Sequence, residues 1–218
     1  STSSVSLNTW THVAVVRISG TVTPYINGSN AGGSASYTTS VASTINPAIG
    51  SSTNANSAEF LTGYISNLRV IKGTGIYTTT FTPSTSPLTT TSQGATANQV
   101  SLLTCQNNTF IDNSTNNFTI TAGSTTVKPV SVSPFTPNSY TGTTIPTTYG
   151  SGYFVGTSAY LTASSYSVNW STFGSYTFEF YVYHTSLSAA NQSYLSTGST
   201  GYTNFYNYGT TNPGAVAI

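Results

Sequence analysis

Apolar and polar residues alternate along much of this chain with the two-residue period of a β-strand. The clearest case is residues 175–184, SYTFEFYVYH. One face of this segment is apolar and consists of Tyr176, Phe178, Phe180 and Val182. The other face carries Thr177, Glu179, Tyr181 and Tyr183. The pattern predicts a strand that turns its apolar face to the core.

A second strong signal is the segment WTHVAVVRISGTVTPYING, residues 10–28. Its β-branched run Val13–Ile18 stops at Ser19-Gly20, resumes at Val22–Ile26 and closes on Asn27-Gly28. β-Branched residues pack well on a pleated sheet, and Asn-Gly tolerates the positive φ angles of a type I′ turn. We expect two antiparallel strands that enter a tight hairpin at the centre of a sheet.

A third strand is predicted at residues 60–72, FLTGYISNLRVIK, where both faces are apolar. One face is expected to carry Leu61, Ile65 and Ile71, and the other Tyr64, Leu68 and Val70. Two apolar faces are typical of a strand that is covered on both sides.

Together these segments predict an almost entirely β protein, a two-sheet sandwich with no convincing helical spacing. The strands Trp10–Ile18, Tyr64–Ile71 and Tyr176–Val182 should be central in it. We expect five side chains of these strands to be buried: Trp10, Val13, Val15, Phe178 and Phe180. The Pro- and Thr-rich segment Tyr77–Thr91 has no periodicity, so we expect either a linker or an extended arm along the surface.

The composition changes the picture of possible partners. Charged residues make up 3% of the 218 residues, and the net charge is +1, whereas an average globular chain is about 25% charged. Four Lys and Arg residues are too few to neutralise a nucleic-acid backbone. No apolar run is long enough to cross a membrane. Little repulsion is left between copies, which favours an assembled, extracellular protein.

The sequence offers no obvious metal or cofactor site. Cys105 is the single cysteine, so neither a disulfide framework nor a multi-thiolate site can form. His12 and His184 lie in apolar strands without acidic neighbours in sequence. We expect packed, hydrogen-bonded histidines, no metal and no cofactor.

Two of these segments carry a family resemblance. The order Trp-x-His-Val-Ala-Val-x-Arg followed by Tyr-Ile-Asn-Gly, and later Gly-Tyr-Ile-Ser-Asn-Leu-Arg-Val, resembles the laminin-G-like branch of the concanavalin A-like lectin/glucanase superfamily. The resemblance implies an antiparallel two-sheet jelly roll. Similar domains are repeated in bacterial surface proteins and phage structural proteins, and binders, fibre modules and enzymes share this fold.

The order of the family's segments is reversed in this chain. Residues 1–87 resemble the C-terminal half of a laminin-G-like jelly roll, residues 88–98 are expected to be a linker, and residues 99–218 resemble the N-terminal half of the next, or of the same, jelly roll. We therefore expect a chain cut out of phase with the domain. It can be a permutant that closes on itself, a unit completed by a neighbouring copy, or a window of a covalent tandem array.

Catalysis is not expected. Glu59, Asp112 and Glu179 are the only carboxylates, and glycosidases usually place two across the scissile bond. By the resemblance, Glu179 lies on a strand comparable to the one that carries clustered acids in related glucanases, but it has no acidic neighbour. We expect a structural Glu179, hydrogen-bonded or paired with Arg17 or Arg69.

The densest aromatic cluster consists of Tyr202, Phe205, Tyr206 and Tyr208. An exposed Tyr can stack on a sugar ring, which would make a lectin-like, glycan-stacking site. The favoured interpretation is that these residues serve the core or an interface, because Tyr suits half-buried surfaces.

Two functions follow as expectations. The first is a structural repeat of an extracellular fibre, filament or virion appendage, in which copies of the chain assemble head to tail. The second is a carbohydrate-binding adhesion module that recognises cell-surface glycans. Both place the protein outside the cell, at a cell surface or on a virion surface.

Overall fold

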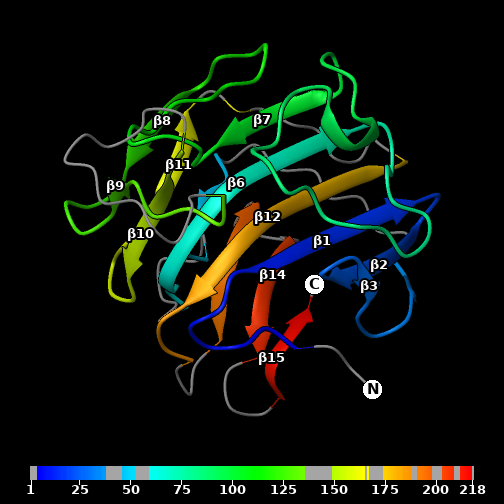
Figure 1. Cartoon of the computed structure of the whole chain (residues 1–218), viewed down its shortest axis with the longest axis horizontal. Helices are drawn as coiled ribbons and strands as arrows, with labels where there is room; N and C mark the ends of the chain where they lie inside the picture. Colours follow the sequence, from blue (N-terminus) through cyan, green and yellow to red (C-terminus); the bar gives the residue numbers. More distant parts are fainter. Residues whose placement is uncertain are drawn as a thin grey trace.

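The computed structural model describes residues 4–37, 46–52, 59–135, 149–164, 166, 174–187, 191–197, 203–208 and 212–217, the last two ranges by their backbone alone. All regular structure in these residues is β, apart from one 3-10 turn, η1 (Ser92–Gly94). Every strand pairing is antiparallel. The strands form two sheets, seen from one side in Figure 1, which confirms the predicted jelly-roll sandwich.

The nine-stranded sheet has the order β3-β2-β1-β12-β6-β10-β9, with β4 added to β2 and β7 added to β6. Its strands are β1 (Thr11–Ile18), β2 (Thr21–Ile26), β3 (Ser29–Asn30), β4 (Ala35–Ser36), β6 (Thr62–Lys72), β7 (Val100–Thr104), β9 (Lys128–Val130), β10 (Ser151–Val155) and β12 (Tyr176–His184). The three strands predicted to be central, β1, β12 and β6, lie side by side in its middle. That prediction is confirmed.

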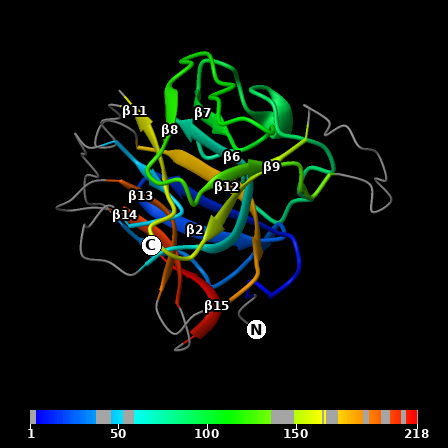
Figure 2. The same ribbon diagram turned by 90° about the vertical axis from the view of Figure 1, so that its left-hand side faces the viewer.

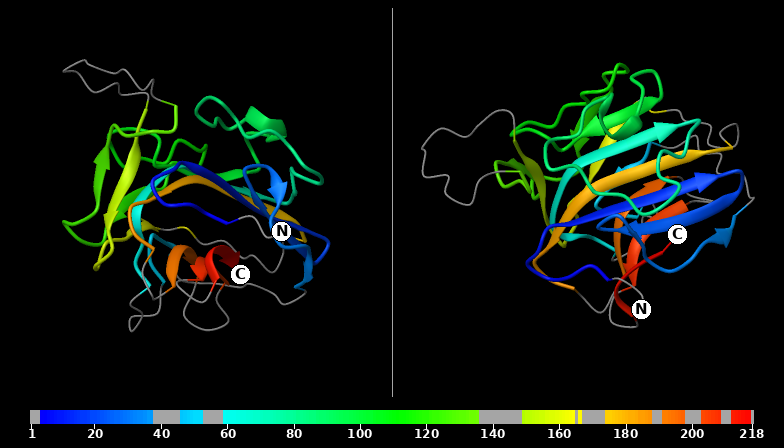
Figure 3. Two further views of the ribbon diagram at one scale, coloured as in Figure 1. Left: turned by 60° about the horizontal axis from the view of Figure 1, so that its bottom comes forward. Right: turned by 45° about the vertical axis from the view of Figure 1, so that its right-hand side comes forward.

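The six-stranded sheet has the order β15-β14-β13-β5-β11-β8. Its strands are β5 (Ala48–Ile49), β8 (Thr119–Ala122), β11 (Leu161–Ser164), β13 (Gln192–Thr197), β14 (Thr203–Tyr208) and β15 (Asn212–Ala217). Figures 2 and 3 show its strands β13, β14 and β15, in orange and red, as a second layer beside the larger sheet.

Two tight turns connect the first three strands of the larger sheet. Ser19 and Gly20 connect β1 to β2, and Asn27 and Gly28 connect β2 to β3, all four with positive φ angles. Positive φ at both central residues is the type I′ geometry that matches the twist of a hairpin. Gly28 is also required by packing, because a Cβ there would lie 1.8 Å from the backbone oxygen of Phe81.

The main core lies between the two sheets. The larger sheet contributes Val13, Val15, Phe178 and Phe180, and the smaller sheet contributes Ile49, Leu161, Tyr194 and Leu195. The predicted burial is confirmed for the first four of these residues. It is wrong for Trp10, which is only half-buried. Trp10 precedes β1 on the face opposite to Val13, so it points away from the core.

The predicted faces of β6 are wrong beyond its middle. Ile65, Leu68 and Val70 all belong to the main core, whereas Ile71 packs in a separate cluster on the other side of the sheet. Asn67 has a φ of 55°, and the pairing with β12 shifts between Glu179 and Tyr181. This irregularity is a β-bulge, which adds a residue to one strand and exchanges its two faces.

An arm crosses the outer face of the nine-stranded sheet. We use the name for residues 74–98, which follow β6 and run across β6, β12 and β1 (Figure 1). Its side chains Tyr77 and Leu88 are buried against the sheet, in two clusters that lie apart from the main core. The arm includes residues 88–98, which we expect from the sequence to be a linker. In the structure, Leu88 and Ala95 of this segment pack against Ile71 of β6.

The two halves of the chain share both sheets. β1 and β6 of the first half pair with β12 of the second, and β6 also pairs with β7 and β10. In the smaller sheet β5 lies between β13 and β11. Within one copy, β1, β5 and β6 of the first half thus pair with strands of the second half. The domain boundaries at residues 87 and 99 stay a prediction.

Candidate functional site

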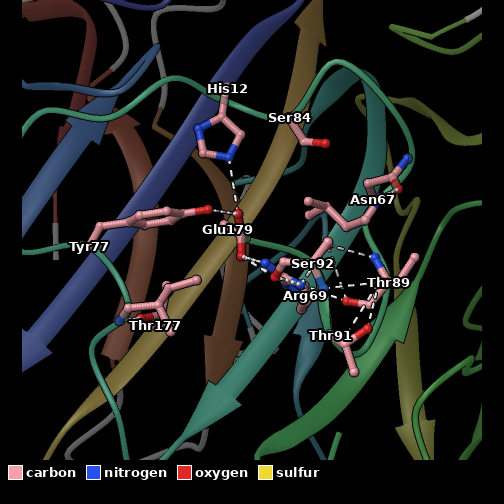
Figure 4. A network of polar contacts seen from close by, with 12 residues as sticks. His12, Asn67, Arg69, Tyr77, Ser84, Thr89, Thr91, Ser92, Thr177 and Glu179 are labelled. Carbon is pink, nitrogen blue, oxygen red and sulfur yellow. Dashed lines mark hydrogen bonds and ion pairs between the residues drawn. The ribbon is translucent and has the colours of Figure 1, made fainter. Parts of the chain in front are cut away.

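A buried polar cluster occupies the middle of the nine-stranded sheet, on the face beneath the arm (Figure 4). At its centre is Glu179 of β12, with a fully buried side chain. Its Oε1 accepts hydrogen bonds from Nε and Nη2 of Arg69, the first at 2.8 Å. Its Oε2 accepts one from the Tyr77 hydroxyl at 2.8 Å and lies 3.2 Å from Nε2 of His12. Three strands and the arm meet at one carboxylate.

Arg69 extends the cluster into the arm. Its Nη1 donates to the backbone oxygens of Thr89 and Ser92, at 2.6 and 3.0 Å, and lies 3.1 Å from Oγ of Ser92. The guanidinium therefore joins the carboxylate on β12 to two carbonyls of the arm, which places a buried ion pair at the anchoring point of a long irregular segment.

The bulge in β6 provides a second anchor. Oδ1 of Asn67 accepts hydrogen bonds from the backbone N–H of Leu88, at 2.8 Å, and from Nε2 of Gln106, at 2.6 Å. A third anchor is the hydroxyl of Tyr181, which donates to the backbone oxygen of Ser84. Backbone groups of an arm that has no strand partner are thus bonded to side chains of the sheet.

The surroundings of Glu179 keep its carboxylate charged and the hydroxyl of Tyr77 protonated. Burial alone raises the pKa of Glu179, but the hydrogen bond from His12 and the charge of Arg69 outweigh burial and hold this pKa below its ordinary value. Burial, with the adjacent Glu179, raises the pKa of Tyr77. The phenol therefore stays a hydrogen-bond donor and the glutamate stays an acceptor.

The sequence offered Arg17 or Arg69 as the partner of Glu179, and the structure selects Arg69. Arg17 lies on the opposite face of the sheet, with its guanidinium carbon 5.9 Å from the centre of the Tyr176 ring. The side chains of adjacent positions on β1 point to opposite faces, so His12 reaches Glu179 and Arg17 cannot.

The other two carboxylates lie outside the cluster around Glu179. Asp112 holds the loop after β7, because its oxygens accept backbone hydrogen bonds from Leu103, Ser114 and Phe118. Glu59 precedes β6 and is half-buried. Neither carboxylate contributes to the cluster around Glu179, whose polar contacts are to Arg69, His12 and Tyr77.

His184 and Cys105, which the sequence offers as possible metal ligands, are both buried in the sandwich. Nε2 of His184 lies 3.0 Å from the hydroxyl of Tyr194, inside the sandwich. Cys105 is buried, and burial raises the pKa of its thiol to about 12. In the described part of the chain, no group of three His, Cys, Asp or Glu side chains could hold a metal ion. No helix in that part is long and apolar enough to span a bilayer.

The aromatic cluster predicted from the sequence falls largely outside the description. Tyr202 is not among the described residues, and Phe205, Tyr206 and Tyr208 lie on β14, where the structure gives the backbone alone. β14 pairs with β13 and β15 in the six-stranded sheet. A glycan-stacking role for these four residues stays a prediction.

The strand register brings together a second group of aromatic residues that the sequence did not indicate. Trp10, Tyr183, Tyr64 and Tyr153 lie next to one another on the outer face of the nine-stranded sheet. We call them the aromatic row. Its members come from four segments far apart in the sequence, so only knowledge of the strand pairing could have found it.

The structure thus defines an antiparallel jelly-roll sandwich in which the carboxylate at the centre of the larger sheet is buried. Comparison with protein families matches residues 1–75 to the model described as the concanavalin A-like lectin/glucanases superfamily. Neither the curated proteins nor the solved structures contain a significant match. Residues 1–75 thus match this superfamily, as the resemblance implied. Because the superfamily includes both lectins and glucanases, the match alone leaves binding and catalysis open.

Proposed function

We propose that this protein is a non-catalytic structural module of an extracellular fibre, filament or virion appendage. The observation that carries the proposal is the distribution of its charged residues. Four of the seven are buried, namely Arg17, Arg69, Asp112 and Glu179. Glu59 and Lys72 are half-buried, and Lys128 is exposed.

A surface with so few charges lacks the repulsion that keeps most proteins apart. Its partners in this proposal are further copies of the same chain, arranged head to tail. Because the two halves already pair within one copy, the copies associate through outer surfaces and strand edges rather than by exchanging halves. Such a module belongs at a cell surface or on a virion.

The buried cluster supports the non-catalytic part of the proposal. A general acid or a nucleophile has to reach the substrate, and the carboxylate of Glu179 is bonded to Arg69 and Tyr77 under the arm. Its lowered pKa is also opposite to the raised value that a general acid needs at neutral pH.

Sedimentation velocity over a wide concentration range tests the proposal. We expect oligomers that form with rising concentration and that persist between low and high salt, because association without surface ion pairs is insensitive to screening. A monomer at every concentration would overturn the structural role.

The second candidate function is a carbohydrate-binding adhesion module. It is supported by the superfamily match over residues 1–75 and by the number of aromatic residues on the strands of this sparsely charged chain. Binding to immobilised neutral polysaccharides tests it independently of self-association.

A further inference from the structure

The aromatic row is a continuous feature of one sheet face. Tyr64 of β6 is paired directly with Tyr183 of β12 on one side and with Tyr153 of β10 on the other. Trp10 continues the row, because the next residue, Thr11, pairs with Val182. Successive ring centroids lie 5.6 Å apart from Trp10 to Tyr183, 5.7 Å from Tyr183 to Tyr64 and 4.9 Å from Tyr64 to Tyr153.

The row lies just beyond the arm. The arm covers the same face as far as His12 and Tyr181, which contact Phe81 and Ser84. Trp10 lies two residues before His12, and Tyr183 lies two residues after Tyr181. The row therefore lies at the end of the sheet where β1 and β6 begin and β12 ends (Figure 1).

The four rings are only partly buried, unlike the aromatic residues of the core. Within the described residues, the hydroxyls of Tyr64, Tyr153 and Tyr183 make no hydrogen bond. Cross-strand aromatic pairs stabilise a sheet, but that role does not require four partly open rings in one line. The row therefore combines apolar ring faces with free donors and acceptors.

The surroundings select the class of ligand. Lys128, paired with Tyr153 at the end of the row, is the one Lys or Arg residue classed as exposed. Stacking of single-stranded nucleic acid on aromatic residues needs a positively charged groove as well, and this chain has four Lys and Arg residues, two of them buried. Protein interfaces of standard size bury about 800 Å² on each partner. An aromatic side chain buries about 150–250 Å² in all, so four rings that are already partly buried supply less than that.

A neutral sugar chain fits both properties of the row. The C–H face of a pyranose packs on an aromatic ring, and its hydroxyls exchange hydrogen bonds with phenols. Neighbouring strands lie about 4.8 Å apart, and a sugar unit in an extended glycan advances by a similar length, so consecutive sugars can meet consecutive rings.

We propose that Trp10, Tyr183, Tyr64 and Tyr153 form a binding site for an extended, neutral polysaccharide that crosses the strands of the nine-stranded sheet. This inference rests on the carbohydrate-binding candidate function and is independent of the structural one. It places the site on the other sheet from Phe205, Tyr206 and Tyr208 of β14.

Affinity electrophoresis in gels that contain hydroxyethyl cellulose, xylan, galactomannan or a β-1,3-glucan tests the site. We expect at least one of these polymers to retard the protein, and Tyr64→Ser and Tyr183→Ser to weaken this binding at least tenfold. Tyr160→Ser, at a half-buried tyrosine beside β11 of the other sheet, is the matched control and should bind normally. Thermal unfolding verifies that each variant is folded.

Fluorescence gives a second readout. Trp10 and Trp170 are the two tryptophans, so in a Trp170→Phe background the emission reports on the row itself. Titration with the retarding polysaccharide should change the emission of Trp10. Tyr64→Phe should keep most of the affinity if stacking dominates.

The outcomes separate the hypotheses. Binding that is lost in Tyr206→Ser and kept in Tyr64→Ser would overturn this site and leave the carbohydrate-binding function in place. Failure of every polysaccharide to bind would overturn the site and that function together. Changed sedimentation of Tyr64→Ser without any glycan binding would assign the row to contacts between copies, which contradicts the proposal.

Discussion

Replacing Glu179 by Gln is the sharpest test of how this sandwich is held together. The substitution keeps the shape of the side chain and removes its charge. Arg69 then remains fully buried without a counter-ion, and the hydrogen bond from Tyr77 loses its charged acceptor. Breaking a buried ion pair by removing one partner costs about 3–5 kcal/mol. Since a domain is stable by only about 5–15 kcal/mol, the loss will be easy to measure.

The assay is urea unfolding at pH 7, followed by tryptophan fluorescence. We expect the free energy of unfolding to fall by about 3–5 kcal/mol, with Glu59→Gln as the control that changes it by less than about 0.5 kcal/mol. The double variant with Arg69→Met should cost less than the sum of the single variants, because the unpaired charge is gone. A loss below about 1 kcal/mol for Glu179→Gln, or strictly additive losses, would refute the reasoning.

Three further predictions concern the core, the pH dependence and catalysis. Phe178→Ala should destabilise the fold by about 3–5 kcal/mol in the same assay; a loss below about 1 kcal/mol would mean that its side chain does not face the core. Burial lowers the pKa of His184 to about 4, whereas the unfolded chain takes up this proton near pH 6.5. Stability should therefore fall as the pH drops from about 6.5 to about 4, by at most about 1.4 kcal/mol per unit, and His184→Asn should flatten that window in urea midpoints measured at several pH values. The purified protein should leave glucans uncut in a reducing-end assay; cleavage that disappears in Glu179→Gln would contradict the non-catalytic assignment.

The alternating pattern predicts a two-sheet β sandwich, and the family resemblance adds the jelly-roll arrangement. The strand Tyr176–Val182 turns the face that its sequence indicates to the main core. The sequence did not indicate that the outer faces of β1 and β12 are buried as well, because the arm that covers them comes from elsewhere in the chain. The pattern failed at Asn67, because a bulge is a backbone event that exchanges the faces of β6 without any change in composition.

Only part of the candidate site could be predicted. A lone Glu on an apolar strand indicated a buried, bonded carboxylate, and the structure supplies Arg69 from two candidate partners. The anchoring of the arm could not be predicted, because it depends on carbonyl groups of Thr89 and Ser92 that carry no sequence signal. The aromatic row was missed for a similar reason, as its members become neighbours only through strand register.

The central claim is that the arm closes the face of the sheet that carries Glu179. Amide hydrogen exchange measured by mass spectrometry tests this most directly. Peptides that cover residues 77–92 should exchange slowly in the native protein, although none of their amides belongs to a strand, because Leu88 and its neighbours are bonded to the sheet. Glu179→Gln should speed exchange in these peptides more than in β1. Free exchange of residues 77–92 in the unmodified protein would contradict the account, because the carboxylate of Glu179 would then be open to solvent and substrate.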